Sequence, residues 1–327
     1  MKAAWYTQFG PAEEVLSMGE LPDPVPGPGE VRVKLAASGI NPSDVKSRAG
    51  SSRPLAGPLV VPHSDGAGTI DQVGPGVDAA LVGTRVWTYN AAYRRAFGTA
   101  AEYVVLPRAL AAPLPDALDF AQGACLGVPA MTAHRCLFGQ GAQGSIAGKT
   151  VLVSGGGGAV GNIAIQLAAW AGARVFATAG SAESMAHAQA AGAEAVVHYK
   201  ERGAAEKIGA LTGGVDLVVE VDLAANALAS PPYLRPGATV ASYASVTDRE
   251  PRIPFSQWTA KNIRLHCVLV YESTPAEFAQ AITDIYAWGG SPFARVAIAA
   301  ALPLDKIVQA HRLVEKGGKQ GQVVLTL

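Results

Sequence analysis

The residues with the clearest chemical potential form a glycine-rich turn. In residues 151–180, VLVSGGGGAVGNIAIQLAAWAGARVFATAG, the pattern Gly156-x-Gly158-x-x-Gly161 follows an apolar strand and precedes a helix. We expect Gly156 to permit a tight turn, Gly158 to let the backbone approach a pyrophosphate, and Gly161 to let the helix pack closely on the strand. A flexible glycine loop would not explain the periodic segments on both sides, so the turn predicts dinucleotide binding.

The helix after the turn is expected to complete the phosphate site. The first N–H groups of a helix have no partner within it, so those of Ala159, Val160 and Gly161 would face phosphate oxygens. Apolar residues are expected along one side of this helix, at Val160, Ile163, Leu167 and Ala171. Gly172 suits the C-terminal cap of the helix.

The end of the next strand indicates which dinucleotide is bound. Enzymes that use NAD place Asp or Glu there to accept from the ribose 2′-OH, whereas this strand ends Ala179-Gly180-Ser181. A carboxylate would repel a 2′-phosphate, so its absence favours NADPH over NADH. Ser181 could donate to that phosphate, with Tyr199 and Lys200 at the end of the following strand nearby. Ser181 is equally suited to a helix N-cap, and this alternative stays open.

The pattern of residue types changes near residue 121, which indicates two lobes. Residues 1–120 contain short β-type runs separated by Gly and Pro, which predicts an irregular, barrel-like β lobe. From residue 121 on, apolar strands alternate with helices, which predicts an α/β domain with a parallel sheet covered on both faces. Strands are expected at 31–40, 66–74, 85–90, 101–107, 151–155, 174–179, 195–199, 216–221, 238–243, 263–270 and 322–327, and helical segments at 119–138 and 304–316.

Composition limits the classes of function. The 327 residues are 49% hydrophobic and 16% charged with a formal net charge of zero, so we expect a globular protein without general attraction to nucleic acid or anionic membranes. The cysteines at 125, 136 and 267 show no metal-type spacing. The N-terminal residues lack the apolar core of a signal peptide, and no stretch of about 18 apolar residues predicts a transmembrane helix. We therefore expect a cytoplasmic protein.

Further segments along the chain share one family pattern. They are GINPSDVKSRAG (39–50), PHSDGAG (62–68), DFAQGACLGVPAMTAHRCL (119–137), GVDLVVEV (214–221), STPAEFAQA (273–281) and AHRLVEKGGKQGQVVL (310–325). With them the chain resembles the medium-chain dehydrogenases/reductases, and more narrowly the zinc-free quinone oxidoreductases of zeta-crystallin type. The resemblance implies a Rossmann NADPH-binding domain at 124–267, inserted in a barrel-like catalytic domain at 1–123 plus 268–327. It also implies a cofactor in the cleft between them and a homodimer or homotetramer.

The resemblance allows zinc ligands to be tested position by position. Asn41 replaces the ligand Cys of zinc alcohol dehydrogenases, Ser64 replaces their His, and the third ligand falls near Val128. Zinc needs three or four N or S ligands in close array, and we expect none here. His63 and Asp65 remain as a pair of possible ligands, and a role in a surface turn is the favoured alternative.

The resemblance also implies which residues do the chemistry. Asn41 would lie beside the nicotinamide and donate to the substrate oxygen or fix the cofactor, with Asp44 one turn further on. The sequence Asn-Pro-Ser-Asp is also a good helix start, and both roles stay open. Thr132 would contact the nicotinamide, or serve helix packing. Ser245 and Gln322 lie where the family has cofactor contacts, although many relatives have Lys at the position of Gln322.

Other polar residues have competing interpretations. Family tyrosines that shape the quinone pocket are replaced by Lys46 and Ser52, and Tyr89, Tyr93 and Tyr243 are expected as half-buried aromatic residues rather than substitutes. Arg48 would anchor the catalytic lobe or form a surface ion pair. His134 is expected as a packed or capping residue, and the histidines at 63, 134, 187, 198, 266 and 311 form no motif.

These observations favour hydride transfer from NADPH to a quinone as the function. A quinone is already electron-poor, so the protein would mainly position it and exclude water. The alternative within enzymes is reduction of an activated C=C bond in an enone or 2-alkenal. A second alternative is a non-catalytic NADPH-binding protein with a structural or RNA-associated role.

Overall fold

The computed structural model describes residues 1–51, 54–139 and 146–327. The chain forms two compact units, one of Met1–Val128 with Val296–Leu327 (unit 1) and one of Pro129–Arg295 (unit 2). The domain division expected from the resemblance, 1–123 plus 268–327 around 124–267, stays a prediction. In unit 2, α10 (Pro275–Gly289) packs on α4 (Met131–Phe138), so both helices belong to one body.

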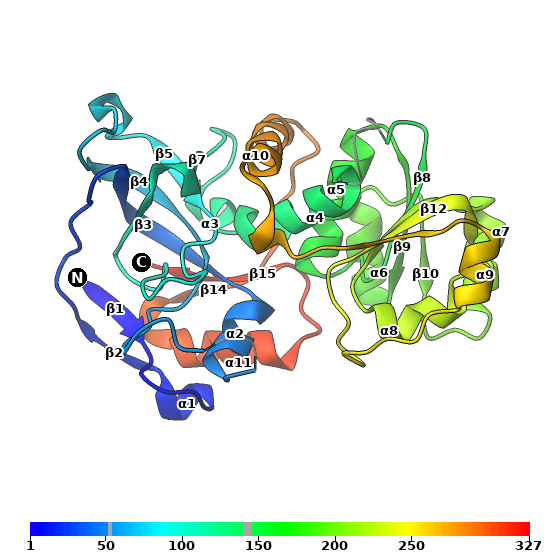
Figure 1. Ribbon diagram of the computed structural model, residues 1–327, viewed down its shortest axis with the longest axis horizontal. Helices are drawn as coiled ribbons and strands as arrows, with labels where there is room; N and C mark the ends of the chain where they lie inside the picture. Colours follow the sequence, from blue (N-terminus) through cyan, green and yellow to red (C-terminus); the bar gives the residue numbers. More distant parts are fainter. Residues whose placement is uncertain (52–53, 140–145) are drawn as a thin grey trace. The chain divides into compact units, whose positions relative to one another are not determined.

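Unit 1 is built on a seven-stranded, mostly antiparallel sheet (Figure 1). The order is β14 (Ile298–Pro303), β15 (Gln322–Thr326), β3 (Glu30–Ile40), β4 (Asp65–Val73), β5 (Arg85–Thr88) and β7 (Ala111–Pro113), and β6 (Tyr103–Pro107) also pairs with β3. A separate ribbon joins β1 (Lys2–Trp5) to β2 (Ser17–Glu20). The strands predicted in the first 120 residues are confirmed within a few residues at each end.

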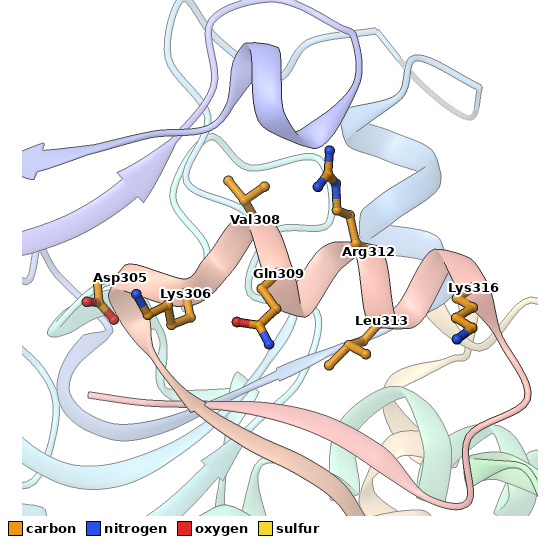
Figure 2. Close-up of a pocket in the computed structure, with 7 residues that line it drawn as sticks. All are labelled: Asp305, Lys306, Val308, Gln309, Arg312, Leu313 and Lys316. Carbon is orange, nitrogen blue, oxygen red and sulfur yellow. The ribbon is translucent and has the colours of Figure 1, made fainter.

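The helices of unit 1 are short, apart from one near the C-terminus. They are α1 (Ala12–Val15), α2 (Pro42–Arg48), α3 (Phe120–Gly123) and α11 (Ile307–Lys316), with single 3₁₀ turns at Ala79–Leu81, Arg108–Leu110 and Leu304–Lys306. The predicted apolar face of α11 is confirmed, because Ile307, Ala310 and Val314 are buried. Its outer face carries charged and apolar side chains around a surface pocket of about 390 Å³ (Figure 2).

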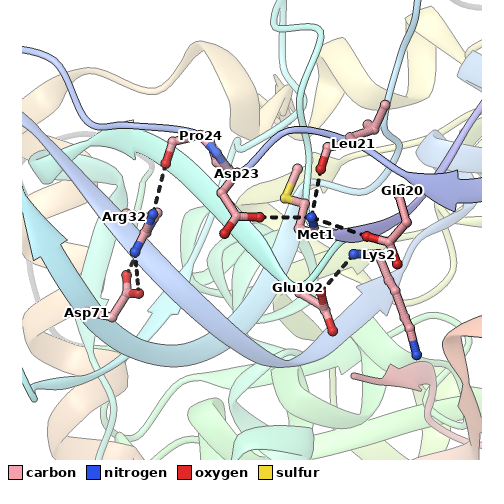
Figure 3. Close-up of polar contacts among 9 residues, drawn as sticks. All are labelled: Met1, Lys2, Glu20, Leu21, Asp23, Pro24, Arg32, Asp71 and Glu102. Atoms are coloured by element: carbon pink, nitrogen blue, oxygen red, sulfur yellow. Dashed lines mark hydrogen bonds and ion pairs between the residues drawn. The ribbon is translucent and has the colours of Figure 1, made fainter.

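Polar contacts near the N-terminus fix the segment that follows β2 (Figure 3). The Met1 amino group donates to the carbonyl of Leu21 at 2.6 Å and to Asp23 at 2.8 Å. Arg32 on β3 pairs with Asp71 on β4 at 2.8 Å and also donates to the carbonyl of Pro24 at 3.2 Å. These contacts hold residues 21–24 beside the main sheet of unit 1.

Unit 2 contains a six-stranded parallel sheet with the order β10-β9-β8-β11-β12-β13. The strands are β8 (Thr150–Val153), β9 (Arg174–Ala179), β10 (Ala195–His198), β11 (Val215–Glu220), β12 (Leu234–Ser242) and β13 (Arg264–Cys267). The first strand in the chain lies in the middle and the order reverses beside it, which is the doubly wound Rossmann topology. The predicted parallel sheet is confirmed. The strand expected at 263–270 ends at Cys267, and a 3₁₀ turn follows at Val270–Glu272.

Helices connect the strands of unit 2. They are α5 (Ala159–Trp170), α6 (Ala182–Ala190), α7 (Ala204–Thr212), α8 (Leu223–Asn226) with a 3₁₀ turn at Ala227–Ala229, and α9 (Phe255–Ala260). The helical stretch expected at 119–138 is divided into α3, a π-helical turn at Leu126–Ala130 that contains Pro129, and α4. Proline has no N–H to donate, so a regular helix does not continue through it.

The expected one-sided burial of α5 is wrong. Residues 161–168 are all buried, because this helix packs on β8 and β9 and also contacts α4 and α6. Two polar residues in it are therefore buried and bonded to each other, with Gln166 Nε2 donating to Asn162 Oδ1 at 2.7 Å. The Gln166 amide also bonds both backbone polar groups of Arg295, at 2.7 and 3.1 Å. None of the helices in the described ranges is long and apolar enough to cross a membrane.

Candidate cofactor and active site

The bend between β8 and α5 owes its shape to four consecutive glycines. Residues 154–157 form a turn that includes Gly156, as expected, and the residue in it with the left-handed conformation that side chains rarely adopt is Gly155, at a φ of +70°. Gly156 is also needed for packing, because a Cβ there would meet Ile165 Cδ1 at 2.8 Å. A Cβ at Gly161 would lie 2.4 Å from the carbonyl oxygen of Gly155, so this glycine lets the helix start against the turn.

Gly158 is the open position of the bend. It is exposed, it is the N-cap of α5, and an added Cβ would meet only the carbonyl oxygen of Gly155, at 3.5 Å. The helix begins at Ala159, so the amides of Ala159, Val160 and Gly161 occupy its first turn, where helices leave N–H groups unpaired. Backbone amides beside a position without a side chain suit a diphosphate.

Three of the predicted residues follow the ends of β9 and β10. An added Cβ at Gly180 would lie 2.7 Å from the Tyr199 hydroxyl oxygen, so the exposed phenol ring lies directly against this glycine. The ammonium of Lys200 is 5.7 Å from the centre of the Tyr199 ring. Ser181 caps α6, and its oxygen accepts from the N–H of Ser184 at 3.2 Å. The N-cap role of Ser181 is thus present, and its hydroxyl hydrogen stays available to a second acceptor.

A buried carboxylate at the end of β11 was missed by sequence reasoning. Glu220 accepts from Ser154 Oγ, the N–H of Asp222 and Asn226 Nδ2, at 2.8, 2.6 and 2.8 Å. Burial raises the pKa of Glu220, although these hydrogen bonds act in the opposite direction. The three donors link the ends of β8 and β11 to α8, and so they fix the carboxyl edge of the sheet beside the glycine bend.

The remaining predicted residues of unit 2 lie on α4 and after β12. Thr132 is buried in α4, where the packing alternative is satisfied. Ser245 accepts from the N–H of Ala224 at 3.2 Å and donates to the carbonyl of Asp248, so its hydroxyl organises the loop after β12. His134 is packed, as expected, and bonds Asp284 at 2.8 Å. Cofactor contacts by Thr132 and Ser245 stay predictions.

Asn41 is the centre of a buried hydrogen-bond network in unit 1. It caps α2, and its N–H donates to Asp44 Oδ2 at 2.8 Å, so the helix-start interpretation is present. Its side-chain nitrogen donates to Asp65 Oδ2 at 2.7 Å, and its oxygen accepts from Gln322 Nε2 at 2.8 Å. The N–H of Val128 donates to the same oxygen of Asp65 at 2.8 Å. The network therefore joins two of the three positions that match zinc ligands, Asn41 and Val128.

The expected surface turn at His63 and Asp65 is wrong, because both side chains are fully buried. His63 has a φ of +79°, and its ring bonds Ser38 Oγ through Nδ1 and His311 Nε2 through Nε2, each at 2.9 Å. Ser38 in turn contacts Thr99 Oγ1 at 2.7 Å. Burial first, and then the neighbouring His311, lower the pKa of His63, and burial lowers the pKa of His311 to about 3.

The donor set of this region does not suit zinc. The matching positions supply an amide, a hydroxyl and an aliphatic side chain, from Asn41, Ser64 and Val128. Across residues 1–51, 54–139 and 146–327, no three His, Cys, Asp or Glu side chains form a group that could hold a metal ion.

Several other interpretations are decided by packing. Arg48 is buried, donates to the carbonyl of Gly10 at 2.6 Å and pairs with Glu315, so it anchors α2 to α11.

Lys46, which replaces a family tyrosine, is exposed, and Ser52 lies outside the described residues. Tyr89 is buried rather than half-buried, with its hydroxyl donating to the carbonyl of Ala109 at 2.7 Å. Tyr93 and Tyr243 are half-buried, as expected.

The doubly wound sheet and the glycine bend define a dinucleotide-binding protein, and comparisons with known proteins identify its family. Residues 27–116 match the alcohol dehydrogenase GroES-like domain, and residues 159–287 match the zinc-binding dehydrogenase domain. The quinone oxidoreductase of Rattus norvegicus is 33% identical over 100% of this chain and 98% of its own length. The chain therefore belongs to the quinone oxidoreductase family of the medium-chain dehydrogenases/reductases, and it is an oxidoreductase.

Solved structures agree with this assignment. An NAD-dependent alcohol dehydrogenase is 30% identical with a TM-score of 0.89, and all of both chains is covered. A mycobacterial protein solved in complex with NADPH is also 30% identical, with full coverage of both chains and a TM-score of 0.84. One of these proteins is described as NAD-dependent and the other was solved with NADPH, so both use a nicotinamide dinucleotide.

Proposed function

We propose that this protein transfers hydride from NADPH to a quinone without the help of zinc. The observation that carries the proposal is the bend at residues 155–161, where the exposed Gly158 precedes the first amides of α5 and leaves room for a diphosphate. The full-length similarity to a quinone oxidoreductase supports the acceptor. The nicotinamide would supply the hydride.

The preference for NADPH is supported by the residues around Gly180. The tip of β9 has no carboxylate, Ser181 follows it, the Tyr199 hydroxyl lies against Gly180, and the Lys200 ammonium is 5.7 Å from the centre of the Tyr199 ring. Two hydroxyl groups and one ammonium can donate to a 2′-phosphate, and the positive charge attracts it. A ribose 2′-OH would find no acidic acceptor at this position.

The work left for the protein is to orient the acceptor and to stabilise its developing negative charge. A quinone accepts hydride readily because the product is an aromatic hydroquinone anion. Asn41 would contribute a hydrogen-bond donor to the quinone oxygen or hold the carboxamide of the cofactor. Asp44 would act through the backbone of Asn41, to which it is bonded at 2.8 Å. The amide, hydroxyl and aliphatic groups at positions 41, 64 and 128 support a reaction without a Lewis acid.

Acceptor specificity tests the proposal. We expect NADPH to be oxidised in the presence of 1,4-benzoquinone or 9,10-phenanthrenequinone, followed by the NADPH absorbance, and 2-alkenals to be poorer acceptors. Faster turnover of 2-alkenals would indicate reduction of activated C=C bonds instead. Tight NADPH binding without turnover of any acceptor would indicate a non-catalytic role.

A further inference from the structure

We propose that Asp65 and Gln322 are positioning residues, which fix the Asn41 side-chain amide in one orientation and thereby decide which of its atoms a ligand meets. This inference rests on the proposed function, since it concerns the group that would contact the quinone or the nicotinamide. Nothing in the sequence pattern assigns this task to Asp65, and Gln322 is expected only as a cofactor contact.

One neighbour of the Asn41 side chain accepts a hydrogen bond and the other donates one, so the amide fits between them in one orientation. Asp65 Oδ2 accepts from Asn41 Nδ2 at 2.7 Å, and Gln322 Nε2 donates to Asn41 Oδ1 at 2.8 Å. Rotating the amide by half a turn would place oxygen against oxygen on one side and two N–H donors against each other on the other side. Both hydrogen bonds would be lost inside a buried site, where a polar group without a partner is strongly destabilising.

Asp65 is itself held in place. Its Oδ2 accepts a second hydrogen bond from the N–H of Val128 at 2.8 Å. Gly127 permits this approach, because an added Cβ there would lie 2.0 Å from Asp65 Oδ1. Oδ1 is buried and has no hydrogen-bond partner among the described residues. Burial, and then the charge of Asp44, raise the pKa of Asp65.

Gln322 is fixed by the sheet. It is the first residue of β15, which pairs with β3 so that Val323 lies opposite Ile40. Its Nε2 donates to the carbonyl of Ile40 at 2.9 Å as well as to Asn41, so both of its amide hydrogens are used. The side chain therefore presents a donor to Asn41 and has no freedom to present its own oxygen.

The orientation leaves one atom of Asn41 with spare capacity to donate. Its Nδ2 carries two hydrogens, and one of them bonds Asp65. Within the described part of the chain the second hydrogen has no assigned acceptor, while Oδ1 already accepts from Gln322. Asn41 would thus meet a ligand as a donor, which suits the oxygen on which negative charge develops during quinone reduction.

Two substitutions at one position separate orientation from simple disruption. Gln322→Lys keeps a donor toward Asn41 Oδ1, whereas Gln322→Glu puts an acceptor there, and both introduce a charge at the same buried position. At neutral pH we expect Gln322→Glu to lower kcat for 1,4-benzoquinone at least 10-fold. The loss of kcat in Gln322→Lys should be several-fold smaller. The affinity for NADPH should change less than about 3-fold in both variants. The activity of Gln322→Glu should recover as the pH falls, because the protonated carboxyl group of the introduced side chain can donate. Equal losses in the two variants, or losses that follow thermal stability alone, would overturn the proposal.

A second pair at Asp65 covers the case in which Gln322→Glu does not fold. Asp65→Asn retains an acceptor oxygen for Asn41 and Val128, whereas Asp65→Val retains none. We expect kcat to be largely kept in the first and lost in the second, and equal effects would contradict the inference.

A measurement without turnover distinguishes this proposal from the proposed function. In the wild-type protein, the Asn41 side-chain amide protons observed by nuclear magnetic resonance should exchange slowly with solvent. They should remain slow in Asp65→Asn and become fast in Asp65→Val. If the wild type reduces no quinone but this pattern holds, the proposed acceptor fails and the positioning of Asn41 does not. Fast exchange in the wild type would overturn the positioning.

Discussion

The phenol ring of Tyr199 lies directly against Gly180, so closely that a Cβ on Gly180 would be 2.7 Å from the hydroxyl oxygen. Tyr199 follows β10 and Gly180 follows β9, and the N–H of Tyr199 donates to the carbonyl of Ala179 at 3.1 Å. This contact places the Tyr199 hydroxyl against Gly180, the residue before Ser181, at the edge where parallel-sheet proteins bind nucleotides, and the Lys200 ammonium is 5.7 Å from the centre of the Tyr199 ring. The first prediction follows from this arrangement.

Replacing Ser181 by Asp should weaken NADPH binding. The carboxylate would repel a 2′-phosphate and remove a donor, at a cost of roughly 1–3 kcal/mol, which corresponds to about 5- to 150-fold in Kd. Aspartate is also a good N-cap, so α6 should remain stable. Titration of NADPH fluorescence measures the effect, and Gln189→Glu, which adds the same charge at the far end of α6, should bind as the wild type does. Unchanged affinity for both NADPH and NADH in Ser181→Asp would place the 2′-phosphate elsewhere.

Alanine at two glycines of the bend should affect different properties, NADPH binding at Gly158 and folding stability at Gly161. At Gly158 the added methyl group meets only one atom, at 3.5 Å, so the free energy of unfolding should fall by no more than about 1 kcal/mol, from the poorer N-cap that Ala makes. The methyl would nevertheless occupy the space proposed for the diphosphate, and NADPH affinity should fall at least 10-fold. At Gly161 the methyl would lie 2.4 Å from a backbone carbonyl, so stability itself should fall. Undiminished NADPH binding by Gly158→Ala would rule out the bend as the diphosphate site.

The paired histidines of unit 1 should make stability depend on pH. Burial lowers the pKa of both His63 and His311 below the value of about 6.5 that each has when unfolded. The unfolded chain therefore binds more protons below that pH, and stability present above pH 6.5 is lost as the pH falls toward the folded pKa values. Each group contributes a slope of about 1.4 kcal/mol per pH unit in this window.

Replacing His311 by Gln tests this directly, because glutamine can still bond His63 but does not titrate. Urea unfolding between pH 4 and 7 should show a slope shallower than that of the wild type by about 1.4 kcal/mol per pH unit. Gln309→Ala, at an exposed position of the same helix, removes no titrating group and serves as the control. A slope that is the same in wild type and His311→Gln would mean that the pair does not titrate as its burial implies.

Metal removal should leave activity intact. We expect no zinc to be bound, because the positions that the family resemblance matches to zinc ligands are Asn41, Ser64 and one near Val128. Quinone reduction should therefore be the same after dialysis against a strong chelator, with metal content measured by elemental analysis. A loss of activity that added zinc restores would contradict the proposed mechanism.

The strands were predictable where their boundaries are marked locally. The run RVFATA, which lies between Gly172 and Gly180, is β9 to the residue. Prediction failed where packing decides the outcome. The one-sided pattern expected for α5 gave way to burial of residues 161–168, because helices as well as the sheet cover it. The turn at residues 154–157 includes Gly156 as predicted, but the left-handed φ falls on Gly155, which four adjacent glycines do not reveal in the sequence.

The candidate site was only partly accessible from the sequence. The glycine bend is a local motif, so its position could be predicted. His63 and His311 are 248 residues apart and meet only because α11 packs on the sheet that contains β3 and β4. The buried environment of Asp65 similarly depends on Gly127 and Val128, which contribute a missing side chain and a backbone amide. A missing side chain and a backbone amide produce no recognisable motif in the sequence, so the surroundings of Asp65 could not be predicted from it.

The most direct test of hydride transfer is a single-turnover reaction of the chelator-treated protein with NADPH that carries deuterium at the transferred position, in the presence of 1,4-benzoquinone. The account predicts one hydroquinone formed for each NADPH oxidised, a slower rate with the deuterated cofactor, and no requirement for added metal. Failure to oxidise NADPH with any quinone, or oxidation only after zinc is supplied, would contradict it.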